Sequence, residues 1–325
     1  GTGLLSYSLY LWHYPIFAFA RVKYFDYELN NIYFLILLTF LMSVVSYYIV
    51  ERPFRYKIKK TIPVVLIIFF INIFTYTIVI KKNGVEDRYN YLKEVYPSIA
   101  IDGKRLSNIR GNYFKNNIEK KPKLYDAGKK KILIVGDSFG QDLFISLYLN
   151  KRFYNNNDFI FLNSSIKTIE NDFEQIKKYE NIIFSFRWYY EGYDKISNNE
   201  ITKFIKKLSQ LQNKKRNIFV TSGGNHYKAM GYVTLLDNEI IKNKSRINLF
   251  NYKNFYYENR RFHSQSRENL FLKKKVIQNN MIYLNKEDYL CNLSKKECDY
   301  IDEFGNKVFY DYGHYTLEGA KFFGK

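Results

Sequence analysis

Cysteine is scarce in this chain, and acidic side chains are well outnumbered by basic ones. Two cysteines among 325 residues are too few for a disulfide-dense mini-protein or a four-cysteine zinc site. Lys and Arg number 51 against 31 Asp and Glu, and the net charge of +20 excludes the acidic, solvating class of disordered chain. Aromatic residues make up 19% of the sequence, more apolar side chain than a disordered protein carries. The length suffices for a core domain with an appendage.

The positive charge alone fits a nucleic acid, an anionic membrane surface or an acidic glycan as partner. Lys, Asn, Ile, Tyr and Phe are abundant together, as in proteins encoded by AT-rich genomes. Codon usage therefore accounts for part of the charge, and we expect no nucleic-acid partner.

Three stretches near the start lack charged side chains altogether: 4–20, 29–50 and 62–80. A helix needs about 20 apolar residues to cross the core of a bilayer. The second and third stretches reach that length, and the first is marginal. The alternative of buried helices in a soluble core is disfavoured, because such helices keep a polar face. We therefore expect about three transmembrane helices.

The loop over residues 51–60 carries five positive charges and one negative charge. The positive-inside rule places such a loop in the cytoplasm, so residues after Lys82 should lie on the far side of the membrane. The chain starts within an apolar pattern and shows no cleavable signal peptide. We expect it to be a piece of a longer membrane protein.

A different pattern begins near Lys131, where short β-type runs alternate with helical segments. The expected strands are 132–135, 159–162, 182–186, 218–221 and 281–284, and the expected helices are 140–149, 170–179 and 200–212. This alternation predicts an α/β fold with a parallel sheet flanked by helices. Residues 81–130 show no strong helix or strand periodicity. Residues 227–280 do not follow the alternation of strands and helices, and we interpret them as an insertion.

Two short motifs carry the candidate chemistry. Gly-Asp-Ser-Phe-Gly at 136–140 puts Ser138 on a strand-to-helix turn, with its amide at a helix N-terminus where a developing oxyanion is stabilised. The structural alternative is a serine that caps the helix. Asp311 precedes His314 by three residues and can orient its imidazole, which leaves the other ring nitrogen to take a proton from a serine.

Together these motifs resemble the SGNH (GDSL-type) hydrolase superfamily, whose first block is Gly-Asp-Ser and whose last is Asp-x-x-His. The resemblance implies a catalytic triad with Ser138 as nucleophile, His314 as general base and Asp311 as its orienting carboxylate. The pentapeptide also matches the nucleophile elbow of α/β-hydrolases. That fold is disfavoured, because its serine follows a mid-sheet strand and here the serine follows the first strand.

The superfamily's other two blocks are altered. No glycine follows the second expected strand, where Ser164 and Ser165 stand, and Arg187-Trp188 replaces Gly-x-Asn after the third. A Gly-Gly-Asn sequence ending at Asn225 comes one connection later and reads more readily as a turn. The candidate oxyanion-hole donors are Ser138, Ser165, Trp188 and Asn225.

Residues 6–15 and 47–55 are similar to the last conserved membrane segments of the acyltransferase-3 family. In the fused form of that family, a further helix, a linking extension and a periplasmic SGNH domain follow. The implied domains are 1–60 for the last acyltransferase-3 helices, 61–82 for the additional transmembrane helix, 83–130 for the extension and 131–325 for the SGNH domain.

This resemblance implies O-acetylation of a bacterial surface polysaccharide, most readily the lipopolysaccharide O-antigen. The implied partners are the glycan acceptor, the inner membrane and the rest of the acyltransferase-3 domain, with the C-terminal domain in the periplasm. Acetyl-CoA would donate acetyl to the membrane portion absent from this chain, and the SGNH domain would bind no cofactor. A membrane-anchored O-acetylesterase with the same triad and an inactive glycan-binding module remain alternatives.

The remaining histidines and cysteines suggest no metal site. Cys291 and Cys298 stand close together before the Asp-x-x-His motif, and in an oxidising compartment they would form a disulfide. No further zinc ligands lie nearby. His13 lies in an apolar stretch, where a functional role and a packed, hydrogen-bonded role are equally open, and His226 and His263 lack ligand spacing.

Overall fold

The computed structural model describes residues 2–23, 29–56, 58–81, 103–119, 128–188, 196–224, 227, 229, 232, 234–243, 252–261 and 263–324. The chain divides into two compact units, of which the first comprises Gly1–Tyr91 with Asn238–Ser245 and the second comprises Leu92–Asp237 with Arg246–Lys325.

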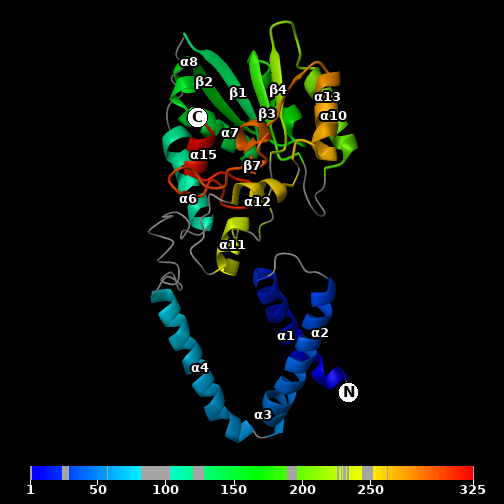
Figure 1. Cartoon of the computed structure of the whole chain (residues 1–325), viewed down its shortest axis with the longest axis vertical. Helices are drawn as coiled ribbons and strands as arrows, with labels where there is room; N and C mark the ends of the chain where they lie inside the picture. The colour runs from blue at the N-terminus through cyan, green and yellow to red at the C-terminus, as the bar shows by residue number, and fades with distance from the viewer. Residues whose placement is uncertain are drawn as a thin grey trace. The chain divides into compact units, whose positions relative to one another are not determined.

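The first unit is helical (Figure 1). Its elements are α1 (Thr2–Lys23), α2 (Leu29–Ser46), the π-helical turn η1 (Tyr47–Glu51), α3 (Arg52–Tyr56) and α4 (Ile58–Lys81). Among the described residues, two helical segments are long and apolar enough to cross a membrane, Ile32–Phe54 and Ile62–Lys81. The first predicted stretch does form a helix, α1, but its Ser, Tyr and His side chains leave it less apolar than these two. Most of the apolar side chains of α4 are exposed, as on a helix that faces lipid or other helices.

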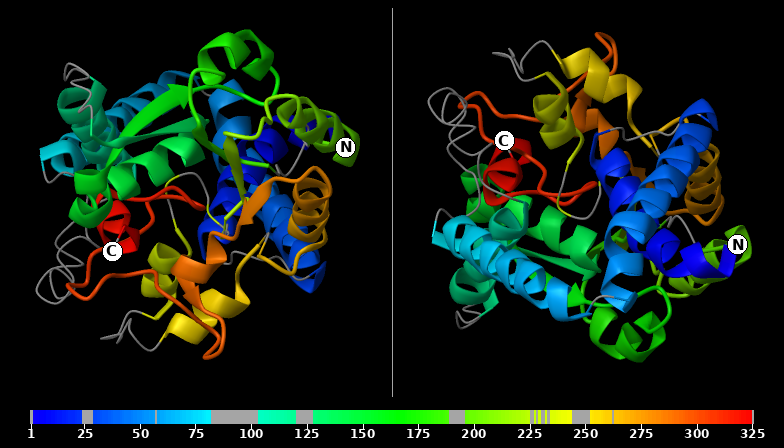
Figure 2. Two further views of the ribbon diagram at one scale, coloured as in Figure 1. Left: turned by 90° about the horizontal axis from the view of Figure 1, so that it is seen from above. Right: turned by 90° about the horizontal axis from the view of Figure 1, so that it is seen from below.

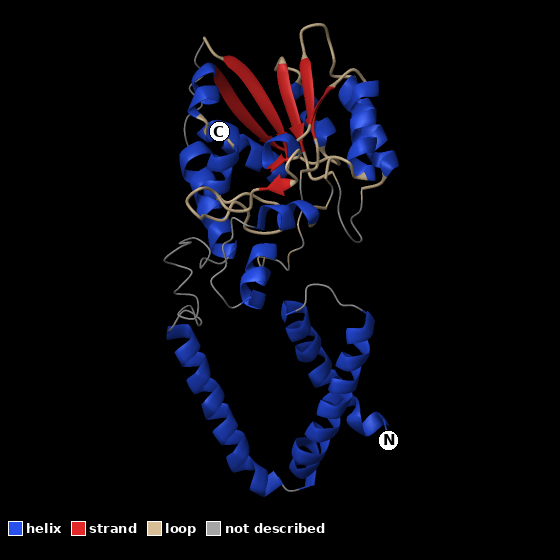
Figure 3. Ribbon diagram, in the orientation of Figure 1, coloured by secondary structure: helices blue, strands red, loops and turns tan. Residues whose placement is uncertain are grey.

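The second unit is built on a five-stranded sheet in the order β2-β1-β3-β4-β5 (Figure 3). The strands are β1 (Lys130–Gly136), β2 (Asn157–Asn163), β3 (Asn181–Ser185), β4 (Asn217–Thr221) and β5 (Ile282–Leu284). All four neighbouring pairs are parallel, so the carboxyl ends of the strands meet at one edge. The predicted α/β fold with a parallel sheet flanked by helices is confirmed.

Helix α7 (Ser138–Leu149) packs on one face of this sheet, and α9 (Phe173–Ile176), α10 (Asn198–Ser209) and α13 (Arg267–Gln278) pack on the other. The chain also forms α6 (Gly103–Phe114), α8 (Lys151–Asn156), α11 (Leu235–Asn243), α12 (Lys253–Glu258), α14 (Glu287–Leu290) and α15 (Leu317–Phe323), with the short turns η3 (Lys115–Glu119) and η4 (Ile169–Asp172) and the small hairpin β6 (Cys291–Asn292) and β7 (Glu297–Cys298). Residues of α11 from Asn238 onward group with the first unit. The red helix α15 packs against α7 (Figure 2).

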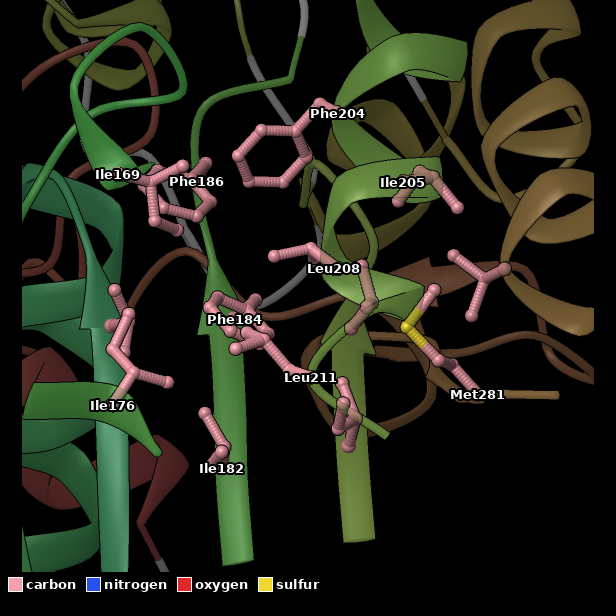
Figure 4. Close-up of a cluster of buried hydrophobic side chains, with 14 of the residues drawn as sticks. Ile169, Ile176, Ile182, Phe184, Phe186, Phe204, Ile205, Leu208, Leu211 and Met281 are labelled. Atoms are coloured by element: carbon pink, nitrogen blue, oxygen red, sulfur yellow. The ribbon is translucent and has the colours of Figure 1, made fainter. Parts of the chain in front are cut away.

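A hydrophobic core cluster lies between one face of the sheet and helices α9, α10 and α13 (Figure 4). Leu133 and Val135 of β1 belong to it, whereas Ile134 between them points to the opposite face, where α7 packs. Each fully buried Leu, Ile or Phe side chain contributes about 1.5–3 kcal/mol to folding. This core fixes the strands whose carboxyl ends carry the candidate site.

Three sequence expectations need correction. The helix expected over 170–179 is a 3₁₀ turn, η4, followed by the single turn α9. The apparent insertion 227–280 ends in α13, whose Leu272 and Val276 are part of the core. The stretch 81–130, which has no clear period, contains helix α6, and α6 belongs to the same compact unit as the sheet.

Candidate active site

Ser138 lies just beyond the carboxyl end of β1, between β2 and β3 in the sheet, where the chain turns into α7. Asp137 caps α7 by accepting a hydrogen bond from the Phe139 amide at 2.9 Å, so Ser138 is the first helical residue and not the cap. The alternative of a capping role for Ser138 is therefore wrong. A Cβ at Gly136 would collide with the Ser185 carbonyl oxygen, which explains the glycine before the turn. The Ser138 side chain is exposed to solvent.

Asp137 has a second structural role. Its other carboxylate oxygen accepts a hydrogen bond from the Arg187 amide at 2.9 Å. Arg187 follows β3, so one side chain fixes the serine turn to the end of the neighbouring strand. Both oxygens of Asp137 are thus occupied by backbone amides, which argues for support of the turn and against general acid or base work.

His314 joins Ser138 and Asp311 in one hydrogen-bonded chain. Its Nε2 lies 2.8 Å from Ser138 Oγ, and its Nδ1 lies 2.8 Å from Asp311 Oδ2. The other oxygen of Asp311 accepts the amides of Gly313 and His314 at 3.0 and 2.9 Å. Burial raises the pKa of Asp311, but the hydrogen bonds and charge of His314 together with the two amides outweigh it and hold that pKa below its ordinary value.

Aromatic rings enclose the imidazole of His314. The ring of Phe139 lies 4.3 Å away between centroids, and Tyr310 stacks almost parallel to the imidazole at 5.6 Å. Tyr312 meets it edge-on at 5.3 Å. With Asp311 holding Nδ1, these rings limit rotation of the imidazole and keep Nε2 directed at Ser138. Such an arrangement can deprotonate a serine hydroxyl for attack on an acyl carbon.

The candidate oxyanion donors separate clearly in the structure. The Ser138 amide belongs to the first turn of α7, where backbone N–H groups lack helical partners. The amide and hydroxyl of Ser165 are both bonded to Thr168 Oγ1, and the indole nitrogen of Trp188 donates to the Thr221 carbonyl inside the core. These donors of Ser165 and Trp188 are therefore committed elsewhere. Asn225 lies outside the described residues.

Sequence reasoning gave no role to two cationic side chains near this edge of the sheet, Arg187 and Lys286. The Arg187 guanidinium stacks over the Tyr312 ring at 4.4 Å and donates to its hydroxyl oxygen at 2.8 Å. Lys286, which follows β5, is buried with its Nζ 5.8 Å from the centre of the Phe139 ring. Burial lowers the pKa of Lys286 to about 8, although the charges of Asp137 and Asp142 oppose the shift. Only the topology reveals these contacts, since both residues are distant in sequence from the motifs.

The two cysteines and the other histidines lie apart from this chemistry. Cys291 and Cys298 form a disulfide that closes the β6–β7 hairpin, with Cα atoms 4.1 Å apart. His13 Nδ1 lies 2.7 Å from the Tyr10 carbonyl oxygen within α1. His263 Nδ1 accepts the Gln265 amide, and His226 falls outside the described residues. Within the described ranges, no group of three or more His, Cys, Asp or Glu side chains could hold a metal.

Comparison with known proteins places the chain in a family. Residues 110–325 match a family model described as an SGNH domain fused to AT3 domains. The chain belongs to this family. The resemblance carried by the Gly-Asp-Ser and Asp-x-x-His motifs is thereby confirmed, and the matched range includes β1, the serine turn and the loop of His314.

Two further similarities are local or structural. O-acetyltransferase OatA of Staphylococcus aureus, strains NCTC 8325 / PS 47 and COL, is 46% identical over 57 residues, which cover 17% of this chain and 10% of that protein. The match thus spans a tenth of those relatives' length. The periplasmic domain of the Salmonella ser. Paratyphi A lipopolysaccharide acetyltransferase has a similar fold, with a TM-score of 0.50 and 18% identity over 67% of this chain and 93% of that one.

Proposed function

We propose that this chain is the C-terminal part of a membrane O-acetyltransferase whose SGNH domain passes acetyl through Ser138 to a hydroxyl of a bacterial surface glycan. The observation that carries the proposal is the hydrogen-bonded chain from Ser138 Oγ through His314 to Asp311. The fusion of this family to AT3 domains supports a transferase. The names of the relatives, an O-acetyltransferase and a lipopolysaccharide acetyltransferase, support a glycan acceptor such as the lipopolysaccharide O-antigen.

The proposed reaction has two balanced steps. Ser138 Oγ attacks the acyl carbon while its proton passes to His314 Nε2, and the oxyanion forms at the Ser138 amide. The tetrahedral species then collapses, the bond to the donor oxygen or sulfur breaks, and His314 returns the proton to that leaving group. In the second step a sugar hydroxyl attacks acetyl-Ser138, His314 takes its proton and returns it to Ser138 Oγ. Asp311 holds the imidazolium that forms in both steps.

The supply of acetyl belongs to the proposal too. Acetyl-CoA would donate the group to the AT3 membrane portion, and the SGNH domain would use a serine ester without a cofactor of its own. The two apolar helices Ile32–Phe54 and Ile62–Lys81 fit a membrane anchor. The proposal places these helices in the inner membrane and the SGNH domain in the periplasm. The positive charge of residues 51–60 supports that orientation, because such loops stay in the cytoplasm.

Labelling by a serine-directed fluorophosphonate tests the nucleophile. We expect Ser138→Ala to abolish labelling, whereas Ser165→Ala, which removes an exposed hydroxyl bonded only to Thr168 among the contacts described, leaves it intact. Turnover of p-nitrophenyl acetate should rise when a glycan acceptor is added. Turnover that ignores the acceptor would indicate an esterase, and full labelling of Ser138→Ala would remove the proposed mechanism.

A further inference from the structure

Helix α6 lies in the sequence region between the membrane helices and the first strand, yet it contacts the candidate active site. Its buried residues Gly103, Leu106 and Arg110 are spaced by three and four, so they share one face of the helix. That face packs in the same compact unit as the sheet. Of these three residues, only Leu106 has a large apolar side chain, and Arg110 brings a charged guanidinium into the buried face.

Arg110 directs its guanidinium at the helix that carries Ser138. One nitrogen donates to Gln141 Oε1 at 2.8 Å, and the other lies 3.4 Å from the carbonyl oxygen of Ser138 itself. The second nitrogen also lies 2.5 Å from Asp142 Oδ1. Arg110 and Asp142 are 5% and 2% exposed, so this ion pair is shielded from water. All three partners belong to the first two turns of α7.

Asp142 extends the contact to the loop of His314. Its second carboxylate oxygen accepts the amide of Tyr315, the residue after His314, at 3.3 Å. The pair Arg110–Asp142 therefore touches both sides of the Ser138–His314 hydrogen bond, through the serine carbonyl on one side and the Tyr315 amide on the other.

The N-terminal end of α6 reaches the same loop. A Cβ at Gly103 would collide with the Tyr310 carbonyl oxygen, so the first turn of α6 packs directly against the backbone of this loop. Tyr310 in turn stacks on the His314 imidazole and donates its amide to the His314 carbonyl oxygen at 3.1 Å. Helix α6 thus contacts each of the two segments that must meet for a proton to move between Ser138 and His314.

Stability alone is a poor explanation for such a pair. Removing two charges from water costs about as much as their mutual attraction returns, and apolar replacements of buried ion pairs are often as stable. A planar guanidinium with several fixed donors is, by contrast, well suited to hold separate segments in register. We propose that Arg110 is a positioning residue that sets the distance between the first turn of α7 and the loop of His314.

The proposal rests on the proposed function, and its test uses the 325-residue chain in detergent micelles. Arg110→Lys keeps the positive charge for Asp142 but loses the planar fork. We expect kcat for p-nitrophenyl acetate and the rate of fluorophosphonate labelling to fall about 10- to 100-fold, because misplacement by about 1 Å costs up to this much. KM and the melting temperature should change little.

Arg216→Lys is the matched control. The Arg216 guanidinium donates to the carbonyls of Tyr179, Leu211 and Lys177 at the amino end of the sheet, far along the strands from Ser138. This variant should lower the melting temperature while kcat stays within about twofold of the wild type, a bound set by the general finding that distant sites act independently. Millimolar guanidinium ion should restore part of the activity of Arg110→Ala and should leave the kcat of Arg216→Lys unchanged.

The double variant Arg110→Met/Asp142→Leu tests whether the ion pair positions α7 against the loop of His314 or only stabilises the fold. If both residues act only structurally, it folds with normal kcat, and the proposal is overturned. A fall in kcat for Arg110→Lys no larger than for Arg216→Lys would overturn it equally. If Ser138→Ala is labelled as well as the wild type, the proposed function fails first; if Ser138→Ala is unlabelled and Arg110→Lys is normal, only the role of Arg110 fails.

Discussion

Replacing Asp311 by Asn changes one atom of the triad and leaves its surroundings in place. Asp311 Oδ1 accepts the amides of Gly313 and His314, so an asparagine would keep its amide oxygen at that position. Its NH₂ group would then face His314 Nδ1, 2.8 Å away in the wild type. A donor at that point requires an unprotonated Nδ1. The ring proton moves to Nε2, which can then only donate to Ser138 Oγ and no longer accepts its proton.

The expected loss follows from this tautomer. The same change in the triad of a serine protease lowers turnover about 10⁴-fold, or about 5 kcal/mol of activation free energy, and we expect 10³–10⁴ here. The effect on folding has its own sign. The pKa of Asp311 is lower in the folded chain, so its contribution to stability is present above the unfolded pKa of about 4 and is lost as the pH falls through the folded pKa. The variant should therefore be less stable than wild type at pH 7 and equal to it at the most acidic pH.

Asp302→Asn is a matched control for this prediction. Asp302 is also buried and its Oδ1 likewise accepts two amides, from Phe304 and Asn306 at 3.0 and 2.7 Å, but its Oδ2 binds the Asn306 side chain instead of a histidine. Labelling rates and p-nitrophenol release between pH 5 and 9 should show a large loss for Asp311→Asn and almost none for Asp302→Asn. A labelling rate for Asp311→Asn within tenfold of wild type would refute the assigned tautomer.

Two further predictions concern charge. Lys286→Met should be more stable than wild type at pH 7 by about 3 kcal/mol, because the pKa of Lys286 falls from 10.5 to about 8 in the folded chain. Since the folded pKa is depressed, the wild type should regain stability as the pH rises from 8 to 10.5. A difference in stability between the two proteins that does not change with pH in thermal unfolding would contradict this. When fused after Lys130, a reporter enzyme that works only in the periplasm should be active, and one that works only in the cytoplasm should be inactive, because the charge of residues 51–60 places that loop in the cytoplasm. Activity of the cytoplasmic reporter would contradict the proposed topology.

The residues of the proposed triad could be predicted because their geometry is encoded locally. Gly136 permits the close turn after β1, and Ser138 follows directly as the first residue of α7. Asp311 and His314 are near enough in sequence for the loop itself to bring them together. The alternation of strands and helices then places both motifs at the carboxyl edge of one sheet, without any knowledge of side-chain packing.

The place of helix α6 and the hydrogen bond of the Trp188 indole could not be predicted, because both depend on partners distant in sequence. The buried face of α6 shows no apolar period, because it includes Arg110, which pairs with Asp142 across 32 positions of sequence (142 − 110). Trp188 reads as a possible oxyanion donor until β4 places the Thr221 carbonyl 2.7 Å from its indole nitrogen. In both cases the partner belongs to an element whose position in the fold cannot be predicted from the local sequence pattern.

The loop that carries His314 shows how a motif without regular secondary structure can hold a candidate catalytic group in place. Between Tyr300 and Thr316 the described chain forms only isolated bridges, Ile301 with Lys307 and Phe309 with Tyr315. Polar groups supply the rigidity that a strand would give: buried Lys307 pairs with Asp237 at 2.5 Å, and its carbonyl accepts the Thr316 hydroxyl at 2.6 Å. A site on a loop stays accurate only when supporting contacts fix that loop. The orientation of the His314 side chain therefore depends on residues that take no part in the chemistry. The Asp-x-x-His motif specifies the candidate reactive groups, but not the contacts that orient them.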